Sequence, residues 1–108
     1  MDPSETQTIE DLIGRAIVPY SERPDAEAVA RLIDDLISQG QVLHARVAAT
    51  AGGRRTERTG AALAEWSYFV DAGPTGRGDH ANWNQARALA RILRNLHSAR
   101  AEQPSGAR

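Results

Sequence analysis

The chain has 108 residues, a net charge of −1 and no cysteine, and 41% of its residues are hydrophobic. This length is typical of a single domain, and the missing cysteines exclude disulfides, thiolate nucleophiles and sulfur-ligated metals. The first ten residues lack the basic and apolar regions of a secretory signal, and no apolar run approaches the roughly 20 residues that cross a bilayer, so we expect a cytoplasmic protein. Nineteen alanines against five aromatic residues favour closely packed helices over strands.

The first predicted helix is short. Thr6 or Thr8 is a suitable N-terminal cap, and Pro19 stops the helix. Apolar residues at helical spacing form its buried stripe: Ile9, Leu12, Ile13 and Ile17. The residues before it are expected to be a loose polar end.

A second, long helix begins after the capping residue Asp25 and ends at Gly52-Gly53. Its apolar residues repeat at steps of four and three if Gly40 fills one position: Val29, Ile33, Leu36, Leu43 and Val47, widened by Leu32 and Ile37. Gly40 is therefore either a point of close helix contact or a break into two helices.

Two further helices are predicted in the second half of the chain. The third begins near Arg54, and its core residues are Ala62, Leu63, Trp66, Phe69 and Val70. A stretch of turn-forming residues over 71–78 separates it from the last helix, which Asp79 caps. The buried stripe of the last helix is Trp83, Ala86, Leu89, Ala90, Leu93 and Leu96. Residues 103–108 are predicted to be a disordered tail.

Short connections force neighbouring helices to run antiparallel. The sequence therefore predicts an all-α, up-down bundle of three long antiparallel helices plus a short N-terminal helix, in one domain over residues 1–102. Because a second copy would stabilise so alanine-rich a core, a homodimer is also expected.

No local motif indicates catalysis, a cofactor or a metal. His44, His80 and His97 lack the spacing of helix-borne metal ligands, and Ser67 lacks the Gly-x-Ser-x-Gly turn of a nucleophile. Asp34-Asp35 point to different faces of a helix. The glycine-rich segment 73–78 has neither the strand nor the Lys-Ser/Thr pair of a phosphate-binding loop, so we interpret it as an interhelical turn.

An arginine stripe is the most informative surface feature. Arg87, Arg91 and Arg94 share one face of the last helix, with Trp83 at its edge as a partly exposed anchor or, alternatively, a cap of the core. Three arginines that open the third helix extend the basic character: Arg54, Arg55 and Arg58. Residues 1–40 carry a net charge of −6 and residues 41–108 a net charge of +5, so the halves neutralise each other or leave a basic face for an acidic partner.

The last two helices resemble those of an uncharacterised family of short, all-helical actinobacterial proteins. The resemblance rests on Gly73-Pro74, the run from Ala86 to Arg91, and Leu96-His97, and covers about the last two-thirds of the chain. It implies a small, helical, cytoplasmic protein and supplies no activity or catalytic residue.

These observations favour a non-enzymatic helical protein–protein interaction module, such as a small regulatory or adaptor protein, that binds a protein partner or itself. Trp83, Arg87, Arg91 and Arg94 are the predicted contact residues. One alternative is a nucleic-acid accessory protein that uses the arginine face, although a sequence pI of 6.3 argues against it. Another is a small helical enzyme or ligand-binding bundle with a pocket formed by His44, Trp66 and His97.

Overall fold

A computed structural model describes residues 3–51, 56–73 and 76–102. Its elements, in chain order, are α1 (Pro3–Ala16), the 3-10 turn η1 (Tyr20–Glu22), α2 (Ala26–Ala51), α3 (Glu57–Ala72) and α4 (Asp79–Glu102). The described ranges contain helices and no strand, which confirms the predicted all-α class. None of the helices in these ranges is both long and apolar enough to cross a membrane.

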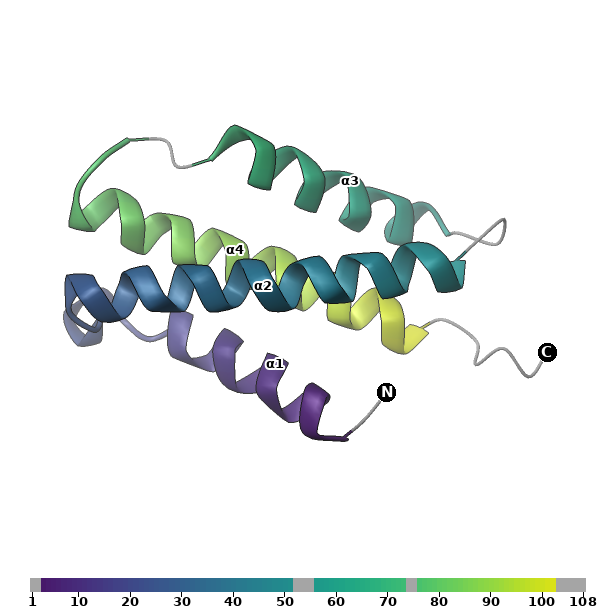
Figure 1. Cartoon of the computed structure of the whole chain (residues 1–108), viewed down its shortest axis with the longest axis horizontal. Helices are drawn as coiled ribbons and strands as arrows, with labels where there is room; N and C mark the ends of the chain where they lie inside the picture. Colours follow the sequence, from purple (N-terminus) through teal and green to yellow (C-terminus); the bar gives the residue numbers. More distant parts are fainter. Residues whose placement is uncertain (1–2, 52–55, 74–75, 103–108) are drawn as a thin grey trace.

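The helices form an up-down bundle around a central pair, α2 and α4 (Figure 1). The chain reverses direction between α1 and α2, between α2 and α3, and between α3 and α4, so α2 and α4 run in parallel. α1 and α3 lie on opposite sides of this pair, and within the described residues they do not contact each other. α4 packs against all three other helices, so it joins the bundle together.

The core follows most of the predicted apolar stripes, although four of the predicted residues are only partly buried: Ile33, Ile37, Phe69 and Val70. On α4 the predicted residues are all fully buried, and Ile92 is buried as well. The α2 residues Val29, Leu36, Leu43 and Val47 are buried too. Ile17 was expected in the core of the first helix, but 48% of it is exposed. The reason is that α1 ends at Ala16, so the helical spacing no longer directs Ile17 inward.

Gly40 is a point of close contact, since α2 continues through it without a break. A side chain added at this position would overlap the six-membered ring of Trp66 on α3. Trp66 is only 1% exposed, as expected for a core residue. The missing side chain of Gly40 therefore lets α2 and α3 approach closely over the indole.

Some helix ends differ from the prediction. α1 begins at Pro3, earlier than the predicted threonine caps, because proline suits the first helical turn, where its missing N–H has no intrahelical acceptor. Asp25 caps α2 as predicted, and its Oδ1 accepts the Ala28 N–H at 2.8 Å. α3 begins at Glu57 rather than near Arg54, because the Thr56 hydroxyl caps it by accepting the Thr59 N–H at 3.0 Å.

Two predictions fall outside the described residues: the glycine stop at 52–53 and the disordered tail at 103–108. The interhelical turn between α3 and α4 is described at both of its ends. Gly73, Gly76 and Gly78 adopt positive φ angles of 70°, 152° and 95°, and this conformation favours glycine.

Candidate functional site

The predicted arginine stripe lies along an open groove. α4 carries Arg87, Arg91 and Arg94, and all three side chains are exposed. The row spans about 10 Å along the helix axis, because each residue adds about 1.5 Å. We call the surface lined by these arginines together with Ile17, Asn84 and Ala88 the arginine groove. The exposure of Ile17, which the sequence did not predict, gives the groove an apolar wall at the end of α1.

The guanidinium groups of the arginine groove have no partner among the described side chains. Ion pairs of the described residues lie elsewhere, between Arg15 and Asp11 at 2.6 Å and between Arg31 and Glu27 at 3.1 Å. Both pairs belong to the acidic first half of the chain, so they do not neutralise the basic stripe. Three like charges on one helix face repel each other, and a bound anion would relieve this repulsion.

Trp83 does not belong to this surface, so the prediction from sequence that it contacts a partner is wrong. It is fully buried, with 0% of its area exposed, and it is among the largest side chains of the core. It lies three and seven residues before Ala86 and Ala90, on the inner face of α4. The polar neighbours Asn82 and Asn84 suggested partial exposure, but they lie on other sides of the helix. Trp83 therefore caps the core, which was the alternative interpretation.

The arginines at the opening of the third helix do not extend the groove. Arg58 is exposed on the first turn of α3 and does not line the groove. Arg54 and Arg55 lie outside the described residues. The basic character that the structure describes is thus concentrated on α4.

An apolar hollow continues the groove toward α3. It is lined by Phe69, His80, Ala81, Asn84, Gln85 and Ala88. The hollow and the arginine groove share Asn84 and Ala88, so they form one continuous surface along α4. Phe69 is half-buried, and it lines the hollow from α3. A partner that binds here meets guanidinium groups at one end and an aromatic ring at the other.

Aromatic and cationic side chains connect η1 to the start of α4 beside this surface. The rings of Tyr20 and His80 meet edge to face with their centroids 5.6 Å apart, and the Arg23 guanidinium lies 4.0 Å from the Tyr20 ring centroid. The Asn84 amide nitrogen lies 3.2 Å from His80 Nε2. These contacts hold the connector that follows Ile17 against α4, so they help to position the apolar wall of the groove.

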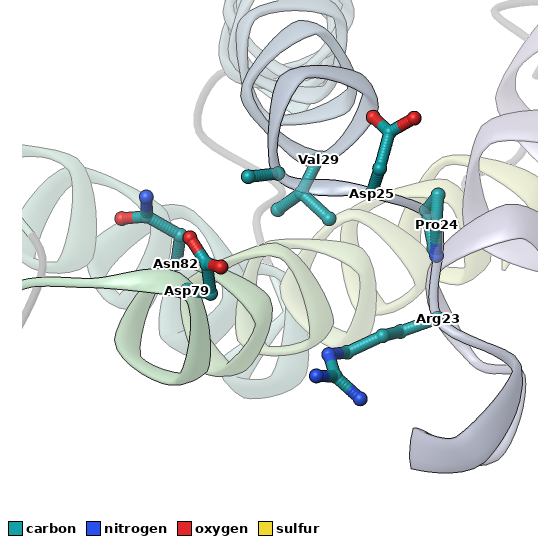
Figure 2. Close-up of a pocket in the computed structure, with 7 residues that line it drawn as sticks. Arg23, Pro24, Asp25, Val29, Asp79 and Asn82 are labelled. Atoms are coloured by element: carbon teal, nitrogen blue, oxygen red, sulfur yellow. The ribbon is translucent and has the colours of Figure 1, made fainter.

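A second hollow lies at the end of the bundle where α2 and α4 begin (Figure 2). Its lining includes Asp25 and Asp79, which come from different helices, together with Arg23, Val29 and Asn82. Figure 2 shows Val29 between the Asp25 and Asp79 side chains, and Asp25 already caps α2. No group of three His, Cys, Asp or Glu residues that could hold a metal occurs in the described part of the chain. This hollow therefore lacks convergent catalytic or metal-binding carboxylates.

His44 and Ser67 are brought together across α2 and α3, a contact that no sequence motif indicated. His44 Nε2 lies 3.2 Å from the Leu63 carbonyl oxygen and 3.2 Å from the Ser67 hydroxyl. A carbonyl oxygen only accepts, so Nε2 carries the proton when it bonds to Leu63. In the other tautomer Nε2 accepts from the Ser67 hydroxyl, and among the described residues no carboxylate contacts Nδ1 to hold the ring in that tautomer. The contact therefore joins two helices.

The predicted pocket of His44, Trp66 and His97 is not found in the hollows described above. Trp66 is enclosed in the core, and its Nε1 has no hydrogen-bond partner within the described residues. His44 and His97 are half-buried. None of the three lines the arginine groove, the apolar hollow or the hollow at the end of the bundle.

The arginine groove and the apolar hollow beside it are thus the surface with the most distinct chemistry. Comparisons of the chain with protein-family models, with curated proteins and with solved structures find no match. The resemblance to a family of actinobacterial helical proteins accordingly stays a prediction.

Proposed function

We propose that this protein is a non-enzymatic protein–protein interaction module, a small regulatory or adaptor protein whose arginine groove binds an acidic segment of its partner. One observation carries the proposal: Arg87, Arg91 and Arg94 line a single groove and have no counter-charge among the described side chains. Guanidinium groups bind carboxylates through two parallel hydrogen bonds, so this row suits a series of Asp or Glu side chains.

The neighbouring surface favours a protein partner over a nucleic acid. Beside the guanidinium groups lie Phe69, Ala81 and Ala88, which suit an apolar side chain and offer nothing to a phosphate. The whole chain also carries a net charge of −1, whereas nucleic-acid-binding domains are usually basic. A segment with acidic residues at one end and an apolar anchor at the other matches both parts of the surface.

A helix is the partner conformation that fits the row best. Arg87, Arg91 and Arg94 follow steps of four and three along α4. Two helices lying side by side have the same rise per residue, so glutamates at the same steps would meet the three guanidinium groups in turn.

The test uses a synthetic alanine-based helical peptide with glutamates at steps of four and three and a leucine beyond the last one. Its control is an isomer with the same composition, in which the glutamates are spread around the helix. We expect the protein to bind the first peptide more tightly in a calorimetric titration at low salt. Equal binding of the two isomers would contradict recognition of a helix face.

A pair of matched variants locates the binding. Arg91→Glu with Arg94→Glu should weaken binding of the first peptide at least about tenfold, because each exposed charge pair contributes about 0.2–1 kcal/mol and reversal adds repulsion. The control is Arg15→Glu with Arg31→Glu, which changes the net charge equally on helices outside the groove. Circular dichroism checks that both variants keep their helicity, and equal weakening by both would exclude a specific groove.

Duplex DNA and single-stranded RNA serve as competing ligands in the same titration. Binding that falls steeply between low and physiological salt, without binding of the peptide, would favour the nucleic-acid alternative. No binding of peptide or nucleic acid would remove the groove as a binding surface for either.

A further inference from the structure

Gln85 is a buried polar residue that the fold leaves without a partner. It lies on α4, one turn after Ala81, and is only 6% exposed. Its side-chain amide makes no hydrogen bond to any described residue. Side-chain amides buried to this extent normally have a hydrogen-bond partner, because burial takes them away from water. Gln85 lines the apolar hollow, so the hollow is where a partner for its amide can enter.

The other side chains of the apolar hollow do not supply this partner. Asn84 Nδ2 lies 3.2 Å from His80 Nε2, so these two residues bond to each other. An amide nitrogen only donates, so the imidazole nitrogen accepts this bond. The remaining lining residues have apolar side chains: Phe69, Ala81 and Ala88. Whatever covers the hollow must therefore bring its own hydrogen-bonding groups to Gln85.

The chemistry of an amide determines which group satisfies it. Gln85 presents an NH₂ donor beside a carbonyl acceptor. A carboxylate only accepts and a guanidinium or ammonium group only donates, so each of them satisfies half of the amide. The backbone N–H and C=O groups of a partner helix are already bonded within that helix. A second primary amide offers both groups side by side, and in a protein partner it belongs to a glutamine or an asparagine.

We propose that the helix bound by the arginine groove carries a glutamine whose amide pairs with Gln85, next to the apolar residue that packs on Phe69. This inference rests on the proposed function and narrows its partner to an acidic helix with one amide at a fixed place. The hollow and the groove share Asn84 and Ala88, so one helix along α4 can reach both. Glutamine suits the site better than asparagine, because its longer side chain reaches an amide that lies below the surface.

The test extends the acidic helical peptide described above, with its glutamates and its leucine. In one series glutamine occupies, in turn, each of the three positions before and after the leucine. In the matched series methionine, which has a similar length and no amide, occupies the same positions. In calorimetric titrations at low salt we expect glutamine at one of these positions to bind the wild type about tenfold more tightly than methionine, since two hydrogen bonds form where methionine would leave the amide dry and unpaired.

The two series also separate this inference from the proposed function. Peptides that all bind, with no position at which glutamine is preferred, would overturn the inference and leave the proposed function standing. Failure of every peptide to bind would refute both.

A variant of the protein should reverse the preference. In Gln85→Met the amide is gone from the hollow, so at the selected position the methionine peptide should bind more tightly than the glutamine peptide. Gln39→Met is the matched control, because Gln39 lies on α2 and does not line the hollow, and it should keep the wild-type preference. A Gln85→Met variant that still prefers the glutamine peptide would overturn the inference.

The unbound protein shows whether Gln85 serves the fold instead. Glutamine and methionine have similar helix propensities, and the amide makes no hydrogen bond that the described fold would lose. Gln85→Met should therefore keep or raise the urea midpoint of unfolding in the absence of peptide. A lower midpoint would show that the amide stabilises the fold, and it would overturn the assignment of Gln85 to a partner. Circular dichroism checks that both methionine variants keep their helicity.

Discussion

At the scale of single residues, the contact between Gly40 and Trp66 sets how closely α2 and α3 approach. Gly40 is buried, and the space that its side chain would fill belongs to the Trp66 indole. The indole nitrogen has no hydrogen-bond partner within the described residues, so packing alone holds this ring in place. Close-packed interiors have few voids to absorb an added methyl group.

Substitution of Gly40 by alanine is expected to destabilise the fold by up to about 2 kcal/mol. Overpacking a core costs about 1–3 kcal/mol, and the better helix propensity of alanine returns only about 1 kcal/mol. Gly14→Ala is the matched control, because nothing lies within 4 Å of the side chain that it would add on α1. Urea unfolding should show a gain of up to about 1 kcal/mol for the control. A gain for Gly40→Ala as well would mean that the indole moves aside freely.

At the scale of the elements, side-chain caps determine where α2 and α3 begin. Asp25 Oδ1 accepts the Ala28 N–H at 2.8 Å, and Thr56 Oγ1 accepts the Thr59 N–H at 3.0 Å. The first turn of a helix leaves N–H groups without intrahelical acceptors, and these side chains satisfy one each. Thr59 is itself buried, so the cap of α3 also places a residue of the core.

Removal of the α2 cap by Asp25→Ala should lower the free energy of unfolding by about 1 kcal/mol, the usual value for a capping aspartate. Asp34→Ala is a suitable control, because Asp34 is exposed in the middle of the same helix and should change stability by less than about 0.5 kcal/mol. Thermal unfolding followed by circular dichroism compares the two. Equal effects would show that the charge near α2, rather than the hydrogen bond, matters.

Local sequence patterns predicted the elements well because caps, stops and apolar stripes are properties of neighbouring residues. Asp25 as a cap and the apolar face of α4 are examples that the structure confirms. Positions that depend on tertiary contacts were predicted less well. Trp83 lies between two asparagines and looked partly exposed, although its spacing to Ala86 and Ala90 was a signal for burial.

In the candidate site, too, features set by neighbouring residues were predicted and features set by tertiary contacts were not. The arginine row on α4 follows from spacing alone, so the sequence revealed it. The apolar wall formed by Ile17 depends on where α1 ends. The position of Phe69 in the lining of the apolar hollow depends on how α3 packs on α4. The contact between His44 and Ser67 joins residues 23 positions apart, for which the sequence has no local signal.

At the scale of the whole molecule, the position of α4 determines how the bundle unfolds. α1 and α3 do not contact each other within the described residues, so any coupling between them passes through α2 and α4. α4 is buried against all its neighbours by large side chains that include Trp83, Leu89 and Leu93. Unfolding of α1 or α3 alone would expose part of this apolar surface to water, which favours unfolding of the whole bundle in a single cooperative transition.

Leu12→Ala on α1 tests this cooperativity. Leu12 is 4% exposed, and truncation of a buried leucine costs about 2–5 kcal/mol. Both tryptophans lie outside α1, on α3 and α4, so their fluorescence follows the rest of the bundle, whereas circular dichroism follows all helices. If the bundle is one cooperative unit, the two signals keep a common urea midpoint, and the substitution lowers it for both.

Ile17→Ala, at a half-exposed position just beyond α1, should leave the midpoint nearly unchanged. A fluorescence midpoint that stays at the wild-type value while the helical signal is lost earlier would show that α1 detaches on its own, leaving α2, α3 and α4 folded.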